Sequence, residues 1–348
     1  MEQKIDLSKA TNRDPVISIS RVLGMVFIVI CHIIKYYPFI PGSEFLGQFF
    51  NCGVHIFLFI SGYLYGMRKI TNFKKWYCKR LITVALPAII VSWLMIIALY
   101  IAGENISFNS IIAYSLDIEG LVFLNNSLSK IFPEITGLGP LWFTTIILLC
   151  YLLVPILQKL IAKVKNKVLF LILVFFIGSI LFLFIHKYVS IIYFVIFSTG
   201  YIAGNIELLN RVSTKFVIVD TIIFLFAIVG RLILHKYIDG TDLYTCYASI
   251  SHFFIGTWII VVLAIINKIS SNMITKISES KAIKILDKYS FYIYLTHGIF
   301  CMSIFSFYEN FSLLPATTLF IVSTFVATVV LKWISTALQK PILKRLYD

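Results

Sequence analysis

Residues 169–185 read LFLILVFFIGSILFLFI, a run without a charged side chain. A transmembrane helix needs about 20 mainly apolar residues, whereas a strand of a membrane barrel alternates apolar and polar side chains. The run does not alternate, so it predicts a helix that crosses the bilayer. The rest of the chain agrees, because 59% of its 348 residues are hydrophobic and only 13% are charged, against about 25% charged in a soluble domain. This composition excludes an ordinary soluble protein and predicts an all-α, polytopic membrane protein.

Ten segments of the chain are apolar enough to be predicted as membrane spans. Their approximate ranges are 16–34, 45–66, 81–102, 139–161, 168–185, 188–206, 215–235, 248–267, 289–308 and 315–338. We expect the first to be retained rather than cleaved as a signal peptide, because no small-x-small cleavage site follows Cys31. Most of the 30 Lys and Arg fall on every second connection, which the positive-inside rule assigns to the cytoplasm. We therefore expect about ten transmembrane helices, both termini in the cytoplasm, and a single membrane-embedded domain over residues 1–348.

The net charge and the spacing of the cysteines indicate which partners and cofactors to expect. The formal net charge is +14, and in a membrane protein such an excess typically faces anionic lipid. We therefore expect the lipid bilayer, and not nucleic acid, as the partner of this charge. The six cysteines show no CxxC or other metal-ligand spacing. We expect no metal site, no disulfide framework and no permanently bound cofactor.

The longest connection on the predicted outer side runs from about residue 103 to 139. It holds Glu104, Asp117, Glu119 and Glu134 against Lys130 as its one basic residue. A connection of this length is more than a turn. Two interpretations are open: it shapes an outward-facing pocket, or it is a solvated loop.

Arg21 and His32 are the notable polar residues of the first span. Eleven residues apart, they come within about 20° of the same helix face and lie roughly 16 Å apart along the axis. Ionisable groups inside spans mark functional sites by default. The alternatives are that Arg21 extends to the inner headgroups and that His32 is an interfacial histidine beside Lys35.

Later segments carry further candidates. Ser290, Tyr294 and His297 share one helical stripe, which should point inward because a polar stripe facing lipid is costly. Arg80, which follows Lys79 at the mouth of the third span, is either ordinary inner-face charge or a phosphate ligand. Two further sets receive simpler interpretations: Ser61-Gly62 as a small pair that lets another helix approach, and His186, His235 and His252 as interfacial.

Taken in chain order, these motifs resemble the acyltransferase-3 family of integral-membrane O-acyltransferases. The resemblance rests on Arg21 with His32, Phe57-Leu58-Phe59-Ile60-Ser61-Gly62-Tyr63, the basic entry to the third span, Leu141-Trp142-Phe143 with Tyr151 and Pro155, and Tyr289-Ser290 with Tyr294 and His297. It covers essentially the whole chain. It implies transfer of an acyl group, mostly acetyl from acetyl-CoA, to sugars of bacterial surface polysaccharides and peptidoglycan.

The resemblance also implies roles for individual residues. His32 and Arg21 are the expected catalytic pair, and His32 acts either as a general base or as a transient acyl carrier. Arg80 matches the second arginine of the family's Arg-x-x-Arg, whereas Tyr77 stands in place of the first and Lys79 is a substitute for it. The donor site is therefore expected at Arg80, Lys79, Tyr294 and His297. A second departure is Gln339, which stands before Lys340-Pro341 where the family often has Glu.

The predicted function is thus a multi-pass O-acyltransferase of the bacterial cytoplasmic membrane. Acetyl-CoA is the expected donor substrate, and a cell-surface glycan or its lipid-linked precursor is the expected acceptor. One alternative is a transporter or flippase for a glycan or small solute, although such proteins normally show related halves or broken helices. A second alternative is a family-like membrane domain that has lost catalysis.

Overall fold

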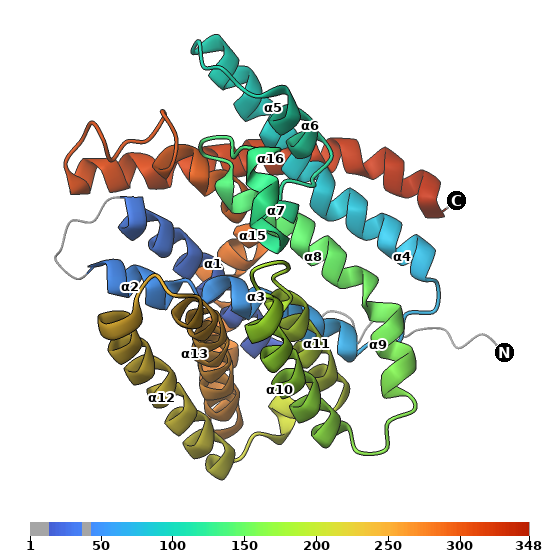
Figure 1. The fold of residues 1–348 in the computed structure, drawn as a ribbon. Coiled ribbons are helices and arrows are strands. Elements are labelled where there is room, and N and C mark those ends of the chain that lie inside the picture. The colour runs from blue at the N-terminus through green and yellow to red at the C-terminus, as the bar shows by residue number, and fades with distance from the viewer. Residues whose placement is uncertain (1–13, 37–42, 348) are drawn as a thin grey trace.

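The structure is a computed structural model that describes residues 14–36 and 43–347. Within these residues the fold is all-helical, as predicted (Figure 1). The first half comprises α1 (Pro15–Tyr36), α2 (Ser43–Phe50), α3 (Gly53–Gly66), α4 (Phe73–Arg80), η2 (Leu81–Ala85), α5 (Leu86–Ile101), α6 (Phe108–Ser115), α7 (Leu121–Leu124), η3 (Asn126–Lys130), η4 (Gly139–Leu141), α8 (Trp142–Leu152) and α9 (Val154–Ile161). The second half comprises α10 (Lys167–Ile185), α11 (Ile192–Asn205), η5 (Leu208–Arg211), α12 (Thr214–Ile238), α13 (Asp242–Ile269), α14 (Ser271–Glu279), α15 (Lys281–Cys301) and α16 (Leu313–Tyr347).

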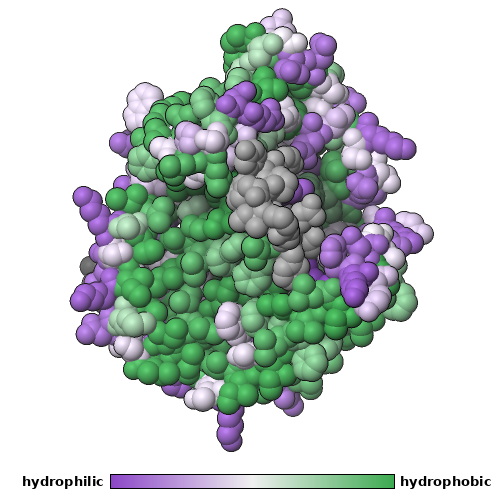
Figure 2. Space-filling view, turned by 90° about the vertical axis from the view of Figure 1, so that its left-hand side faces the viewer, coloured by the Kyte–Doolittle hydropathy of each residue, from purple (hydrophilic) through white to green (hydrophobic). Residues whose placement is uncertain are grey.

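Seven helical stretches in the described part of the chain are long and apolar enough to cross a membrane. Each of the ten predicted segments lies on helical structure, but three differ from a single full-length span. Segment 45–66 is divided into α2 and α3 around Asn51 and Gly53, two weak helix formers. Segment 188–206 forms α11, which has only 14 residues. Segment 289–308 extends seven residues beyond the end of α15 at Cys301. The face of the molecule drawn in Figure 2 is suited to lipid, because it is broadly hydrophobic with hydrophilic side chains mainly along its left and right edges.

The two short helices α3 and α11 pack against each other near the centre of the molecule (Figure 1). Each carries two glycines one turn apart, Gly62 and Gly66 on α3 and Gly200 and Gly204 on α11. A Cβ atom added at any of the four would overlap a backbone carbonyl oxygen of the opposite helix. Small residues at this spacing let two helix backbones approach closely. The predicted packing role of the small pair Ser61-Gly62 is therefore confirmed for Gly62.

The middle of the long connection of residues 103–139 packs against the bundle, whereas most of residues 104–109 and 126–134 are exposed. Its residues Asp117 and Glu119 are buried. The Thr144 hydroxyl at the start of α8 donates to the Asp117 carboxylate, and the Thr145 hydroxyl donates to the Asp117 carbonyl at 2.8 Å. Burial raises the pKa of both carboxyls, and the charge of Asp117 raises that of Glu119 further. This segment therefore has a fixed structure that helps to shape the site below.

Candidate active site

His32 of α1 and His297 of α15 meet between the two helices. The His32 Nδ1 atom lies 2.7 Å from the His297 Nε2 atom, and the rings stack with centroids 5.0 Å apart. The second nitrogen of His297, Nδ1, lies 2.7 Å from the Tyr294 carbonyl oxygen one turn earlier in α15. Each ring is thus fixed in place by a hydrogen bond.

The hydrogen bonds also fix where the protons lie. A carbonyl oxygen only accepts, so the His297 Nδ1 atom carries a proton and donates it to Tyr294. A neutral His297 ring then presents the lone pair of Nε2, and the His32 Nδ1–H donates to it. His297 is completely buried, where a charged ring would be costly. When the His32 ring is neutral as well, its Nε2 atom carries a lone pair, as a general base or a nucleophile requires.

Tyr294 holds this arrangement from the side. Its hydroxyl donates to the Pro140 carbonyl at the entrance to α8, and its ring packs against Phe57 and Phe143. The predicted inward orientation of its stripe is confirmed, since Ser290, Tyr294 and His297 are all buried. Neither Tyr294 nor His297 is among the described residues that line the adjacent cavity. The structure therefore places both residues beside His32 and outside the described wall of the cavity.

His32 opens onto a cavity of about 630 Å³. This volume lies in the range of small-molecule sites, roughly 300–1,000 Å³. The outer connection contributes Phe123 and Glu134 to the wall, so its interpretation as part of a pocket is correct. Burial raises the pKa of Glu134, and the positive charge of Lys35 opposes that rise. The cavity brings the candidate base together with a space for a polar substrate.

Three further polar residues line the same cavity: His55 of α3, Arg231 of α12 and His252 of α13. The Arg231 guanidinium contacts the His252 Nε2 atom, and the His252 ring lies 5.2 Å from the His55 ring between centroids. Sequence reasoning assigned none of them a role. A signal was present for Arg231, a charged residue within an apolar predicted span, whereas His252 was interpreted as interfacial and His55 was given no interpretation.

Arg21 lies in the same helix as His32 but belongs to a different part of the structure. Its guanidinium forms an ion pair with Asp287 of α15, at 2.8 Å and 2.9 Å to the two carboxylate oxygens. The side chain of Asp287 is only 2% exposed, while that of Arg21 is 32% exposed. The ion pair ties α1 to α15, the same two helices that supply the histidine pair. Arg21 and His32 thus share a helix face, as predicted, but act through separate contacts.

Arg80 ends α4 directly before η2, a π-helical turn of the kind often found at functional sites. Its guanidinium lies 5.3 Å from the centroid of the Tyr65 ring and 6.0 Å from that of Trp76. Lys79 precedes it, with its backbone carbonyl accepting a hydrogen bond from Thr83. Arg80 thus lies beside two aromatic rings, and neither Arg80 nor Lys79 is among the described residues that line the cavity.

The two residues that depart from the family pattern each form a hydrogen bond to a neighbouring element. The Tyr77 hydroxyl donates to the Leu148 carbonyl of α8 at 3.4 Å. Gln339 is buried and donates to the Ile82 carbonyl of η2 at 3.0 Å. An uncharged Gln therefore anchors α16 to the turn that follows Arg80.

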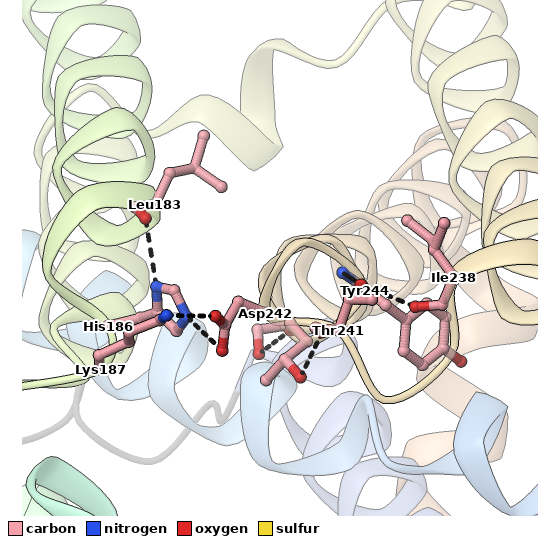
Figure 3. A network of polar contacts seen from close by, with 9 residues as sticks. Leu183, His186, Lys187, Ile238, Thr241, Asp242 and Tyr244 are labelled. Carbon is pink, nitrogen blue, oxygen red and sulfur yellow. Dashed lines mark hydrogen bonds and ion pairs between the residues drawn. The ribbon is translucent and has the colours of Figure 1, made fainter.

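The remaining histidines lie near aspartate carboxylates at helix ends. Figure 3 shows His186 and Lys187, which follow α10, pointing toward Asp242 at the start of α13. The distances to its carboxylate are 3.5 Å from His186 and 2.6 Å from Lys187. His235 similarly lies 3.4 Å from Asp239. The prediction that His186 and His235 are interfacial fits these positions, whereas His252 belongs to the cavity.

A family model described as an acyltransferase domain matches residues 15–337. No curated protein and no solved structure matches the chain.

Proposed function

The chain belongs to the acyltransferase-3 family, whose model spans nearly its whole length, and from this premise we propose that it transfers an acetyl group from acetyl-CoA to a hydroxyl of a cell-surface or lipid-linked glycan. A membrane acyltransferase follows from the family and from the apolar helices. Ten spans, cytoplasmic termini and a place in the bacterial cytoplasmic membrane are part of the proposal. The histidine pair at the cavity is the observation that carries it.

The pair supports a direct transfer step. The His32 Nε2 lone pair takes the proton of an acceptor hydroxyl in the cavity while the hydroxyl oxygen attacks the thioester carbonyl carbon. The C–S bond then breaks, and the proton on His32 passes to the departing thiolate, which gives the ester and free CoA. His297 keeps the ring of His32 in the required tautomer throughout, as the third member of a hydrolase triad does for its histidine.

The same lone pair also supports a covalent route. Here Nε2 attacks the thioester carbonyl carbon, the C–S bond breaks, and CoA leaves as the thiolate. The acceptor hydroxyl oxygen then attacks the acyl carbon, the bond to Nε2 breaks, and the hydroxyl proton passes to water, which gives the ester and the neutral His32 ring. The two routes differ in kinetics, since only the second releases CoA before the acceptor binds. Ping-pong kinetics or an acetyl group trapped on His32 supports the covalent route.

The proposed donor site lies at the basic residues beside η2. Acetyl-CoA is polyanionic, and Arg80 with Lys79 offers positive charge for its phosphates. The rings of Tyr65 and Trp76 border the Arg80 guanidinium and add an apolar surface next to it. The ion pair between Arg21 and Asp287 supports a structural role for Arg21, which holds α1 against α15.

The test is transfer of labelled acetate from acetyl-CoA to a glycan by the reconstituted full-length protein. We expect His32→Ala to lower the rate by about 10²- to 10⁴-fold, the usual contribution of general acid–base catalysis. His235→Ala is the matched control, because it removes a half-exposed histidine outside the cavity. Equal insertion of both variants in the membrane is checked by their yield in detergent. Full activity of His32→Ala would refute the proposal.

A further inference from the structure

The helices α10 and α11, which pack side by side (Figure 1), carry a basic cavity at one end and an apolar groove along their length. Among the described residues, those that line these two features are different from those that line the cavity at His32. The proposed transfer reaction therefore leaves both features without a role.

The basic cavity has a volume of about 540 Å³ and lies at the start of α10. Lys165, Lys167 and Arg211 contribute three positive charges to its wall, and its described lining contains no carboxylate. The 19-residue α10 begins in this wall, so the positive end of its dipole adds to the potential of the side chains. The cavity is therefore suited to an anion.

The acid that follows the cavity wall in sequence has a partner elsewhere. Glu207 comes directly after the lining residue Ile206 but is not part of the described lining. Its carboxylate accepts a hydrogen bond from the Asn210 side chain at 3.2 Å. The positive charge of the cavity wall is thus not balanced by an acid within that wall.

The apolar groove runs between α10 and α11 and has a volume of about 610 Å³. On α10 its wall is formed by positions at steps of three and four residues from Phe170 to Leu181, which is one stripe of the helix. On the other side it is formed in the same way by positions from Ile191 to Ser198. Both walls are apolar apart from Ser198.

The cavity and the groove meet at a hydrogen bond between the two helices. The Lys167 ammonium donates to the Asn205 side-chain oxygen at 2.8 Å. Lys167 lies three residues before Phe170 and Asn205 lies seven residues after Ser198, so each residue continues the stripe that lines the groove on its own helix. Both residues also line the basic cavity. The two features therefore form one continuous site with a charged end.

The length of the groove suits a lipid chain. From Lys167 to Leu181 the axis of α10 rises by roughly 21 Å at about 1.5 Å per residue. One leaflet of a bilayer contributes about half of a hydrocarbon core that is about 30 Å thick. The groove can therefore hold a chain over the whole depth of a leaflet.

We infer that α10 and α11 bind an anionic phospholipid, with its phosphate among Lys165, Lys167 and Arg211 and an acyl chain in the groove. The charge of the cavity selects the headgroup, as in other basic pockets between membrane helices. The continuity of the cavity with the groove selects a ligand that has both a charged head and an apolar chain. By filling the groove, the lipid stabilises α10 against α11, the helix that also packs on α3.

The experiment measures lipid binding by the full-length protein after its lipids have been exchanged for detergent. The probes are dioleoyl phosphatidylglycerol, dioleoyl phosphatidylcholine with the same chains and a zwitterionic head, and glycerol 3-phosphate without chains. Affinity is taken from the rise of Tm with probe concentration. We expect phosphatidylglycerol to bind at least about 10-fold more tightly than phosphatidylcholine, and glycerol 3-phosphate to bind much more weakly because it buries no apolar chain.

One pair of variants tests the headgroup site. Lys165→Gln combined with Arg211→Gln should weaken phosphatidylglycerol binding by about 5-fold for each charge removed, hence roughly 25-fold in total. Lys159→Gln combined with Lys163→Gln is the matched control, because it removes two exposed charges from the preceding segment outside the described wall of the basic cavity. Each shift is measured from the variant's own lipid-free Tm, which separates binding from folding.

A second pair of variants tests the groove. Ile177 lines the groove and is 53% exposed, whereas Ile180 on the same helix is 50% exposed and lies outside the described lining. Ile177→Trp should obstruct the groove and weaken phosphatidylglycerol binding by at least about 5-fold. Ile180→Trp should leave it unchanged, because it adds the same bulk to another face of α10.

The inference is overturned by equal affinity for phosphatidylglycerol and phosphatidylcholine. It is also overturned if the variants of the cavity or of the groove lose no more affinity than their matched controls. Binding of glycerol 3-phosphate as tight as that of phosphatidylglycerol would indicate a site for free phosphate compounds and would overturn the assignment to a lipid. None of these outcomes depends on acetyl transfer, so the proposed function is tested separately.

Discussion

Replacement of His297 by Phe tests the assignment of protons in the histidine pair. The substitution keeps an aromatic ring against His32 but removes the nitrogen that accepts the His32 Nδ1–H at 2.7 Å. An unsatisfied buried donor costs about 1–3 kcal/mol. His32 is then also free to move its proton to Nε2, which blocks the atom that accepts the substrate proton. Since about 1.4 kcal/mol is a factor of ten in rate, we expect kcat to fall roughly 10- to 100-fold.

The matched variant is His297→Gln, whose amide oxygen can accept the same hydrogen bond. We expect it to retain much more activity than the Phe variant. The assay is steady-state acetyl transfer, with kcat and the KM for acetyl-CoA determined separately. A positioning role predicts a loss in kcat with little change in KM. A wild-type kcat in His297→Phe would refute the reasoning, and a rise in KM alone would favour the donor-binding role expected from the sequence.

Three further predictions concern the donor site, the outer connection and the helix pair. Arg80→Gln should raise the KM for acetyl-CoA about 10-fold with little change in kcat, through loss of a charge-assisted contact to phosphate; an unchanged KM contradicts the donor site. Asp117→Asn should raise the Tm at pH 8, by about 2–4 °C for each kcal/mol that the wild type loses by burying a charged carboxylate. The gain should shrink toward pH 4, where the wild-type carboxyl is protonated and uncharged. The direction of this pH dependence follows because burial raises the pKa of the Asp117 carboxyl, so the stability of the wild-type protein falls as pH rises. A Tm gain that does not vary with pH would show that burial of the charge is not the cause. Gly204→Val should lower the Tm by roughly 5–10 °C, because the added side chain would overlap the Tyr63 carbonyl. Thermal denaturation in detergent measures the Tm of the Asp117 and Gly204 variants.

The helices were predictable from sequence, whereas the contacts between them were not. Hydropathy depends on residues close together in the chain, so each predicted segment lies on helical structure. The break at Asn51 was missed because a sliding average hides two weak helix formers inside an apolar run. An inward orientation of His297 followed from the cost of exposing polar groups to lipid. Its contact with His32 did not, because the two residues are 265 positions apart and meet only through packing.

Charged residues show the same limit. Arg21 was identified as unusual in an apolar span, but its partner Asp287 lies among lysines in a segment that the sequence shows only as a polar helix start. Arg231 lies within the predicted span 215–235 and received no role from the sequence. Whether such a residue faces headgroups or a cavity depends on the neighbouring helices α13 and α1, which a single sequence does not reveal.

The close pair of α3 and α11 has a consequence for how the protein is made. Each is a 14-residue helix, shorter than the roughly 20 residues that span a bilayer alone. About 125 residues separate the end of α3 from the start of α11, which at roughly 5–20 residues per second is on the order of ten seconds of synthesis. During that interval the glycine face of α3 leaves the ribosome without its native partner. We expect the nascent chain to depend on the membrane insertion machinery until α11 has been made.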